Sequence, residues 1–467
     1  MNFLLFLAFL GVNFASFEAR ISESLKVSLS DGSQLIGRYL SSHSGRGIRA
    51  FLGIPYAEAP LGNLRFRDPV PKSPWTETLY AAREPNACLS VDYIFRSSNK
   101  TIGSEDCLYL NVYVPQNPDS KDPLPVMVNF HGGGFMTGHG GRKYFGPDYL
   151  LDQDVILVSG NNRLGIFGFL STNTLECPGN FGMKDQVEIL KWVQKNIGQF
   201  GGDKDSVTIF GQGSGGVCVT YHTISPLSKG LFHRAIAQSG THFSKWAQRD
   251  SEVSAANTRK LAEKLECPAE DVKEMIECLR NVPSEDLISL LSDFFTWNVY
   301  PLVLWAPVVE PESENAFLTE DPAKLSGGDD IPFLIGITSN EGSIISTGLM
   351  REQNLIDEVK SKLNVLLPDL FIYGDYNEEI RSSLTNMITE FYLQNREVDL
   401  NDPEMYQKFT DSATDTCFLS GLSVFLEKRT PESLSSNTFL YLFNHRGESS
   451  YAEVQLGNPE IDHGKNQ

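Results

Sequence analysis

The stretch from Val207 to Val219 constrains the fold more than any other part of this chain. It opens with a β-branched and aromatic run, continues with six residues of which four are glycine, and ends in the apolar run 217–219. Such a run, ending abruptly in glycines, predicts a buried strand and a sharp turn, and the second apolar run predicts a helix. Gly213 and Ser214 lie at the centre of this turn. We therefore expect a strand–turn–helix unit that holds these two residues at the end of a strand.

Strands and helices are expected to alternate around this unit. Further strands are predicted at 124–130, 155–159, 332–337 and 439–443, and apolar residues at helical spacing predict a helix over 183–197. Strands that alternate with helices in this way are typical of an α/β fold. We expect a large, mostly parallel sheet with helices on both faces.

Three other segments complete the organisation. Alternating residues over 21–49 predict a small antiparallel hairpin, 251–291 is predicted to be helical, and 352–428 is helical with an interruption at 367–369. We find no internal repeat and no low-complexity linker. Residues 20–467 are therefore interpreted as one large domain with helical insertions.

Charge restricts the possible partners. The chain has 39 basic and 59 acidic residues and a net charge of −20 at pH 7. A surface this acidic repels nucleic acid and anionic membranes, so both are excluded as partners. We expect neither a metal nor an organic cofactor.

The first 19 residues are expected to be a signal peptide. Their apolar core, 3–12, is too short to span a bilayer and is typical of a signal-peptide h-region, with a buried N-terminal strand as the alternative. No later stretch approaches the length of a membrane span, so the mature chain should be soluble and secreted. Seven cysteines and a glycosylation sequon at Asn99 fit an extracellular location.

A series of short motifs follows in fixed order along the chain. They are Gly53-Ile54-Pro55-Tyr56-Ala57, Glu105-Asp106-Cys107-Leu108-Tyr109-Leu110-Asn111, His131-Gly132-Gly133-Gly134-Phe135, Arg163-Leu164-Gly165, Lys184-Asp185-Gln186, Phe200-Gly201-Gly202-Asp203 and Val207-Thr208-Ile209-Phe210-Gly211. With these motifs the chain resembles a type-B carboxylesterase, from the cholinesterase-like branch of the α/β-hydrolases. The resemblance covers nearly everything after the signal peptide and implies the α/β-hydrolase fold. Gln212 is similar to its counterpart in the insect juvenile hormone esterases and their relatives.

The resemblance implies a serine nucleophile that is activated by a histidine base and an acid. The serine of such enzymes lies at the centre of a G-x-S-x-G turn, and here that position, 213, is glycine. Ser214 follows one residue after the nucleophile position. Shifting the strand by one residue, so that Ser214 takes the nucleophile position, would turn every strand side chain to the other face. We expect Ser214 to begin the helix with its side chain directed away from the oxyanion hole; a displaced nucleophile is the alternative.

The other parts of the family's site have counterparts in this chain. The resemblance assigns the oxyanion hole to Gly133, Gly134 and the N–H of Ser214, the acid to Glu341, the base to His463, and support of the triad to Ser239. Around His463, Glu460 replaces the glycine of the family's motif and Asn466 stands where an acid is usual. A solvated loop or tail residue is the alternative for Glu341 and for His463.

The resemblance also implies two disulfides, Cys88–Cys107 and Cys267–Cys278. The remaining cysteines are interpreted as buried free thiols: Cys177, Cys218 and Cys417. The chain stops at Gln467, before the strand and helices that close the sheet in the family. We therefore expect the sheet edge at 439–443 to be unpaired and apolar.

Two functions are consistent with these residues. The first is a secreted carboxylesterase-like protein without catalysis, which binds a small apolar ester or terpenoid-like ligand or offers its surface to a protein partner. The second is a working carboxylic-ester hydrolase that uses Ser214. The glycine at 213 favours the first.

Overall fold

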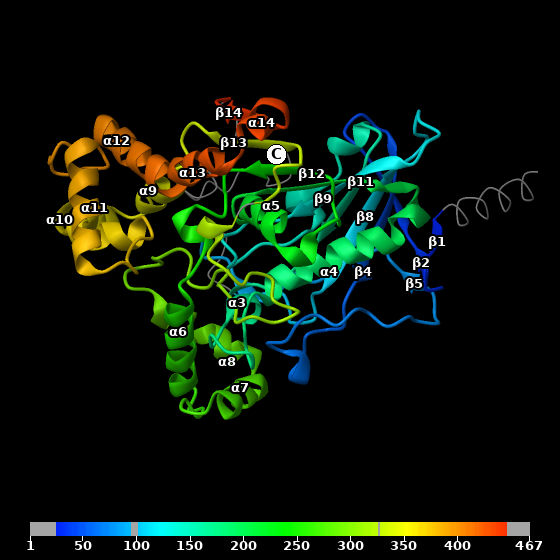
Figure 1. Ribbon diagram of the computed structural model, residues 1–467, viewed down its shortest axis with the longest axis horizontal. Coiled ribbons are helices and arrows are strands. Elements are labelled where there is room, and N and C mark those ends of the chain that lie inside the picture. The colour runs from blue at the N-terminus through cyan, green and yellow to red at the C-terminus, as the bar shows by residue number, and fades with distance from the viewer. Residues whose placement is uncertain (1–24, 95–100, 326, 446–467) are drawn as a thin grey trace, which may run out of the picture.

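A nine-stranded sheet lies at the centre of the molecule. Figure 1 shows the computed structural model, which describes residues 25–94, 101–325 and 327–445. The strand order is β14-β13-β12-β11-β9-β10-β8-β4-β3. All neighbouring strands from β14 to β10 are parallel, whereas β8, β4 and β3 follow in antiparallel pairs. The predicted large and mostly parallel sheet is confirmed.

The strands closely follow the pattern of apolar runs. The run predicted at 124–130 coincides with β9, and the runs predicted at 155–159 and 332–337 are each displaced by one residue. The sheet consists of β3 (Arg38–Ser41), β4 (Gly47–Pro55), β8 (Tyr109–Pro115), β9 (Leu124–Phe130), β10 (Ile156–Gly160), β11 (Gly202–Gln212), β12 (Arg234–Gln238), β13 (Phe333–Thr338) and β14 (Thr438–Phe443). The predicted N-terminal hairpin is formed by β1 (Lys26–Ser28) and β2 (Gln34–Ile36), which are joined by β5 (Leu79–Tyr80). A separate ribbon pairs β6 (Ser90–Val91) with β7 (Thr101–Ile102).

Helices surround the sheet and extend beyond its ends. In Figure 1, α4 and α5 lie in front of the strands, α6 to α8 project downward, and α10 to α12 form a group at the left. The helices are α2 (Arg142–Phe145), α3 (Gly165–Phe169), α4 (Phe181–Asn196), α5 (Ser214–Ile224), α6 (Ser251–Lys264), α7 (Val272–Asn281), α8 (Ser284–Ser289), α9 (Ser343–Leu349), α10 (Gln353–Leu370), α11 (Glu378–Phe391), α12 (Pro403–Thr414), α13 (Ser420–Lys428) and α14 (Pro431–Ser436). The two predicted helical regions are confirmed.

One expected break is in the wrong place. An interruption was predicted at 367–369, yet α10 continues through Pro368 to Leu370. The helix departs from helical geometry at Lys362 instead, where φ is −128°. Proline has no N–H to donate to the carbonyl four residues before it, and its ring crowds that carbonyl. It therefore distorts the preceding part of the helix while the helix itself continues.

A buried ion pair fixes α4 against the end of β10. Arg163 donates from Nε and Nη2 to the two carboxylate oxygens of Asp185, at 2.9 and 2.7 Å, and both side chains are buried. The backbone N–H of Arg163 also donates to Asp185, at 2.9 Å. Bidentate, charge-assisted bonds of this kind are strong and directional, and they orient the loop between sheet and helix.

Both predicted disulfides are present. Cys88 bonds Cys107 with a Cα–Cα separation of 4.9 Å, and Cys267 bonds Cys278 at 5.7 Å. The three other cysteines are free and buried, as expected: Cys177, Cys218 and Cys417. Within the described ranges, no helix is long and apolar enough to cross a membrane.

Candidate active site

The predicted site residues that the structure describes lie at one edge of the sheet. Gly213 follows β11, Ser239 follows β12, Glu341 comes three residues after β13, and the segment 131–134 follows β9. These strands are neighbours and parallel, in the order β13-β12-β11-β9. Their carboxyl ends therefore share one edge, where ligands bind in open α/β sheets.

Gly213 occupies a sharp turn between β11 and α5. Its φ and ψ are 59° and −122°, a combination that glycine adopts at little cost and that strains other residues. Its N–H donates a 2.8 Å hydrogen bond to the carbonyl of Gln238, the last residue of β12. A Cβ built on Gly213 would meet no heavy atom of the described residues within 4 Å. The turn thus has the geometry of a nucleophile elbow, and the described residues leave space where a side chain at position 213 would project.

Ser214 is the first residue of α5, as predicted from the sequence. It is only 4% exposed, whereas Gly213 is half-buried and Gln212 is exposed. The turn therefore presents position 213 to solvent and withdraws position 214 from it. The next residue, Gly215, lies so close to the Phe130 carbonyl that a Cβ there would overlap it.

The glycine loop after β9 lies directly against the elbow. A Cβ on Gly132 would come within 2.5 Å of the Gln212 carbonyl oxygen, so the two chains pass in backbone contact. Gly133 and Gly134 have φ values of 119° and 62°. The N–H groups of these two residues and of Ser214 have no hydrogen-bond acceptor among the described residues. Three free N–H donors beside the elbow can stabilise an oxyanion or a carboxylate.

Glu341 lies across from the elbow at the end of β13. The N–H of Thr338 donates to its Oε1 at 2.7 Å, and the Ser239 hydroxyl also hydrogen-bonds the carboxylate. Burial raises the pKa of Glu341 above its ordinary value, and these two hydrogen bonds only partly oppose the rise. Ser239, at a φ of 57°, precedes Gly240, which packs on the carbonyl of Gly213. Ser239 therefore connects Glu341 to the elbow, and its role in supporting a triad stays a prediction.

The predicted base, His463, lies outside the described residues, as does the sequon residue Asn99. Within the described ranges, no histidine hydrogen-bonds Glu341. Burial lowers the pKa of three nearby histidines, to about 4 for His131 and to about 3 for His222 and His242. These imidazoles are neutral at pH 7 and belong to the packed interior.

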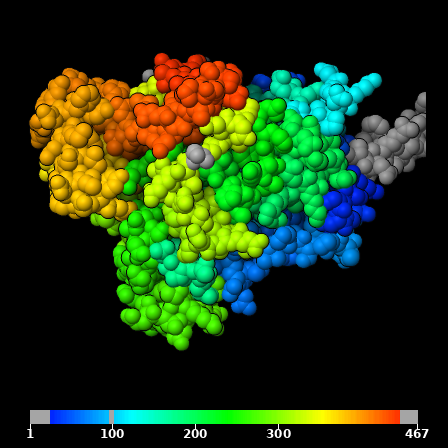
Figure 2. Space-filling view, viewed as in Figure 1, coloured from blue at the N-terminus to red at the C-terminus, as the bar shows by residue number. Residues whose placement is uncertain are grey.

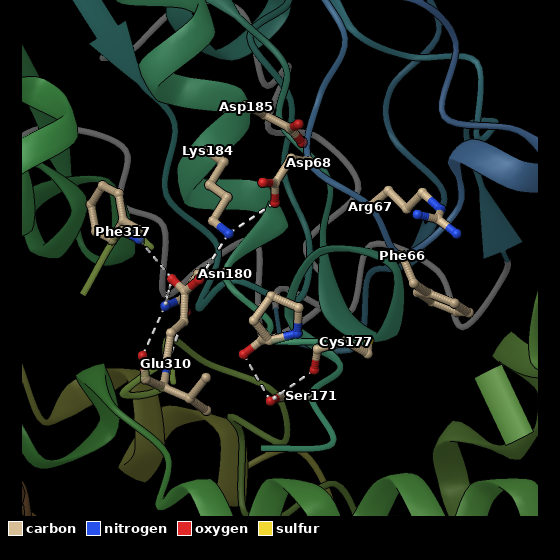
Figure 3. A network of polar contacts seen from close by, with 12 residues as sticks. Phe66, Arg67, Asp68, Ser171, Cys177, Asn180, Lys184, Asp185, Glu310 and Phe317 are labelled. Carbon is tan, nitrogen blue, oxygen red and sulfur yellow. Dashed lines mark hydrogen bonds and ion pairs between the residues drawn. The ribbon is translucent and has the colours of Figure 1, made fainter. Parts of the chain in front are cut away.

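A charge network around the buried Lys184–Glu310 pair anchors the segment 303–310, which packs on the oxyanion loop (Figure 3). Lys184 of α4 bridges Asp68 and Glu310, each at 2.8 Å. Glu310 also accepts bonds from the Asn180 amide at 2.8 Å and from the Phe317 N–H at 2.9 Å. Burial raises the pKa of Glu310, and Lys184 opposes that rise.

The segment before Glu310 is thereby anchored beside the site. A Cβ on Gly134 would lie 3.5 Å from the side chain of Val303, and the N–H of Trp305 approaches Met136 Sδ at 3.5 Å. Met136 also lines an apolar hollow with Leu164, Ile166 and Ile288.

Sequence reasoning missed the backbone partners of the site. The carbonyl of Gln238 accepts from the N–H of Gly213, and the N–H of Thr338 donates to Glu341. Both contacts use backbone atoms, so the side chains of Gln238 and Thr338 did not indicate them. Thr338 follows the strand predicted at 332–337, and this position was its only signal. No strand was predicted at 234–238, so nothing in the sequence indicated Gln238. No group of three His, Cys, Asp or Glu in the described part of the chain could hold a metal ion.

Comparisons with known proteins agree with this geometry. The model of the carboxylesterase family matches residues 23–466. Juvenile hormone esterase of Tribolium castaneum is 39% identical over 431 residues, which span 90% of this chain and 72% of that protein. Esterase FE4 of Myzus persicae is 39% identical over 439 residues, which span 92% and 75% respectively.

A solved structure matches over most of the chain. The crystal structure of juvenile hormone esterase from Manduca sexta, with OTFP covalently attached, superimposes with a TM-score of 0.79 at 30% identity. The match covers 92% of this chain and 80% of that one. The predicted α/β-hydrolase architecture is therefore confirmed.

Proposed function

This chain belongs to the carboxylesterase family, and on that basis we propose that it is a secreted member that binds a small apolar ester or terpenoid-like ligand without cleaving it. The observation that carries the proposal is Gly213 at the elbow. The turn is built as a nucleophile would require, and the residue that it presents has no side chain.

Loss of the nucleophile removes the first chemical step. Acyl transfer through a serine enzyme requires a hydroxyl that an adjacent base can deprotonate. Ser214 supplies a hydroxyl, but it begins α5 and is withdrawn from solvent, whereas position 213 is open. The oxyanion donors and Glu341 remain, so the site keeps its capacity to hold a polarised carbonyl or a carboxylate.

The apolar character of the ligand is inferred from two observations. Met136, two residues after the oxyanion loop, lines a small hollow whose walls are mostly apolar side chains, with the polar Ser90 among them. Two relatives are named juvenile hormone esterases, and that name describes the substrate of those proteins. Secretion is supported by two disulfides, which persist in oxidising compartments, together with the apolar start of the sequence.

The second candidate is a carboxylic-ester hydrolase that uses Ser214. It is favoured by the retained oxyanion N–H groups, the retained Glu341 and the proximity of Ser214, one residue from the elbow. In this case a local shift of the turn would have to bring the Ser214 hydroxyl to the side of the elbow that position 213 faces.

Hydrolysis of an aryl ester separates the two candidates. We expect the purified chain to be inactive, Ser214→Ala to change nothing, and Gly213→Ser to gain activity because a hydroxyl then occupies the open position. Hydrolysis by the unaltered chain that Ser214→Ala abolishes would establish the second candidate and refute the first.

OTFP provides a readout that does not depend on turnover. It is covalently attached in the Manduca sexta structure, and without a nucleophile this chain should bind it only reversibly. Intact-mass measurement should show no adduct on the unaltered chain and one adduct on Gly213→Ser. Thermal stabilisation of the unaltered chain by OTFP would demonstrate the binding cleft, and its absence would contradict the ligand-binding proposal.

A further inference from the structure

Three backbone N–H groups at the elbow have no acceptor among the described residues, namely those of Gly133, Gly134 and Ser214. Gly133 and Ser214 are buried, and Gly134 is half-buried. Almost all buried N–H groups in native proteins are hydrogen-bonded, and an unpaired one costs free energy comparable to a lost hydrogen bond. These donors, which come from two separate segments, are therefore suited to an acceptor that a ligand brings.

The donor at the start of α5 is held in place by the packing of that helix. At the end of α5 the Ser225 hydroxyl donates to the Phe317 carbonyl at 2.7 Å, and the Phe317 ring packs edge-on against His222 with 5.4 Å between the ring centroids. In Figure 2 the yellow-green segment that precedes β13 lies beside the green segment that includes α5. Donors that are fixed in advance lose little freedom when they bind an acceptor.

Glycine at position 213 leaves room for one more oxygen atom of a ligand. In the acyl-enzyme of a serine esterase, the acyl carbon is bonded to a carbonyl oxygen in the oxyanion hole and to the serine Oγ. Here the Oγ is absent, and a Cβ on Gly213 would meet no heavy atom of the described residues within 4 Å. A free carboxylate has a similar planar group, and its second oxygen can lie in this space. An ester oxygen there would carry a further carbon chain, which needs more room than a bare oxygen.

We propose that the elbow binds the carboxylate of an apolar carboxylic acid in preference to the corresponding ester, with one oxygen on the three free N–H groups and the other beside Gly213. This inference rests on the proposed function and specifies the polar group of its ligand. Hydrogen bonds to an ionised acceptor are about twice as strong as those to a neutral one. Ser214 also begins an eleven-residue helix, and the N-terminus of a helix favours negative charge.

Two features of the chain oppose a bound anion. The net charge of −20 repels anions in general, and Glu341 lies at the same edge of the sheet. The N–H of Thr338 and the hydroxyl of Ser239 already hydrogen-bond the Glu341 carboxylate. Burial raises the pKa of Glu341, which favours its neutral form. The repulsion is therefore smaller than two full charges in contact would give.

Calorimetric titration of the full chain with decanoate and with methyl decanoate tests the preference. Both compounds have the same apolar chain, so a difference in affinity reports on the polar group. We expect decanoate to bind at least about tenfold more tightly at pH 7. Equal affinity, a preference for the ester or no binding of decanoate would overturn this inference and leave the proposed function standing. Failure of methyl decanoate and OTFP to bind as well would overturn the proposed function too.

A side chain at position 213 tests the location of the carboxylate. Gly213→Ala places a methyl group in the space assigned to the second oxygen, so the affinity for decanoate should fall at least about tenfold. Gly230→Ala is the matched control, since its φ is also positive, at 78°, and its Cβ meets no described atom within 4 Å. This control should bind decanoate as the unaltered chain does. Undiminished binding by a Gly213→Ala variant with an unchanged circular dichroism spectrum would place the acid elsewhere and overturn the proposal.

Carbon-13 NMR of decanoate labelled at its carboxyl carbon tests the charge without any substitution. N–H donors favour the ionised form, so the pKa of the bound acid should lie below that of the free acid. The carboxyl resonance of the bound acid should consequently stay constant between about pH 5 and pH 7. Apolar burial without these donors would raise the pKa of the acid. A bound resonance that titrates in this range would therefore overturn the proposal.

Discussion

The N–H of Gly213 donates a 2.8 Å hydrogen bond to the carbonyl of Gln238, which joins the elbow to the end of the neighbouring strand. The bond uses backbone atoms alone, so it does not depend on which side chain occupies position 213. Gly240, two residues beyond Gln238, packs on the carbonyl of the same glycine. The elbow is therefore shaped by β11 and β12 together. The backbone hydrogen bond remains whichever residue stands at position 213.

A side chain at position 213 should fit but strain the backbone. The Cβ of Gly213→Ala meets no atom of the described residues within 4 Å, yet its φ of 59° with ψ of −122° is unfavourable for an L-residue. We expect the free energy of unfolding to fall by about 1–3 kcal/mol, measured by urea denaturation. Gly198→Ala is the matched control, since it also has open space but no positive φ. Equal effects of the two substitutions would contradict a strained elbow.

Position 215 should tolerate no side chain. A Cβ on Gly215 would overlap the Phe130 carbonyl oxygen and lie 3.0 Å from that of His131. Because both obstacles are backbone, Gly215→Ala must push α5 away from β9, at a cost of about 3 kcal/mol. Gly230→Ala, where φ is positive but space is open, should cost less. Circular dichroism melts of the two variants would compare them directly; equal midpoints would count against the close packing.

The charge on Glu341 should lower stability as pH rises. Burial raises its pKa above the ordinary 4.5, so the folded state holds its proton more tightly than the unfolded state does. The cost in free energy of unfolding that comes from ionising Glu341 is absent below the pKa of the unfolded state and fully present above the pKa of the folded state. Glu341→Gln should therefore exceed the unaltered chain in free energy of unfolding at pH 8, and this advantage should vanish near pH 4. An advantage that is independent of pH would exclude this linkage.

The Lys184–Glu310 pair should be costly to break from one side. Their side chains are 5% and 0% exposed, so Lys184→Met leaves a buried carboxylate without its cation and should cost about 3–5 kcal/mol. The double variant Lys184→Met/Glu310→Gln should recover part of this loss because no buried charge remains. Lys204→Met, which removes an exposed pair with Asp205, should leave the denaturation midpoint unchanged. A double variant that is less stable than Lys184→Met would refute this explanation.

Much of the fold was determined by local pattern. The runs at 124–130, 207–210 and 439–443 are apolar because they lie in the sheet, and each became a strand there. Pattern also determined that Ser214 begins a helix and that position 213 lacks a hydroxyl. The break predicted near Pro368 was wrong, because proline's local preference did not decide where α10 would bend.

The tertiary structure alone decided what surrounds position 213. That Ser214 is withdrawn while Gly213 is open depends on β9 passing in contact with the turn, which is a contact between segments some eighty positions apart. The raised pKa of Glu341 depends on burial by the whole domain. Sequence specifies which groups exist and how the chain turns locally. Long-range packing, which no local pattern encodes, decides which of these groups meet, which are buried and which stay open to a ligand.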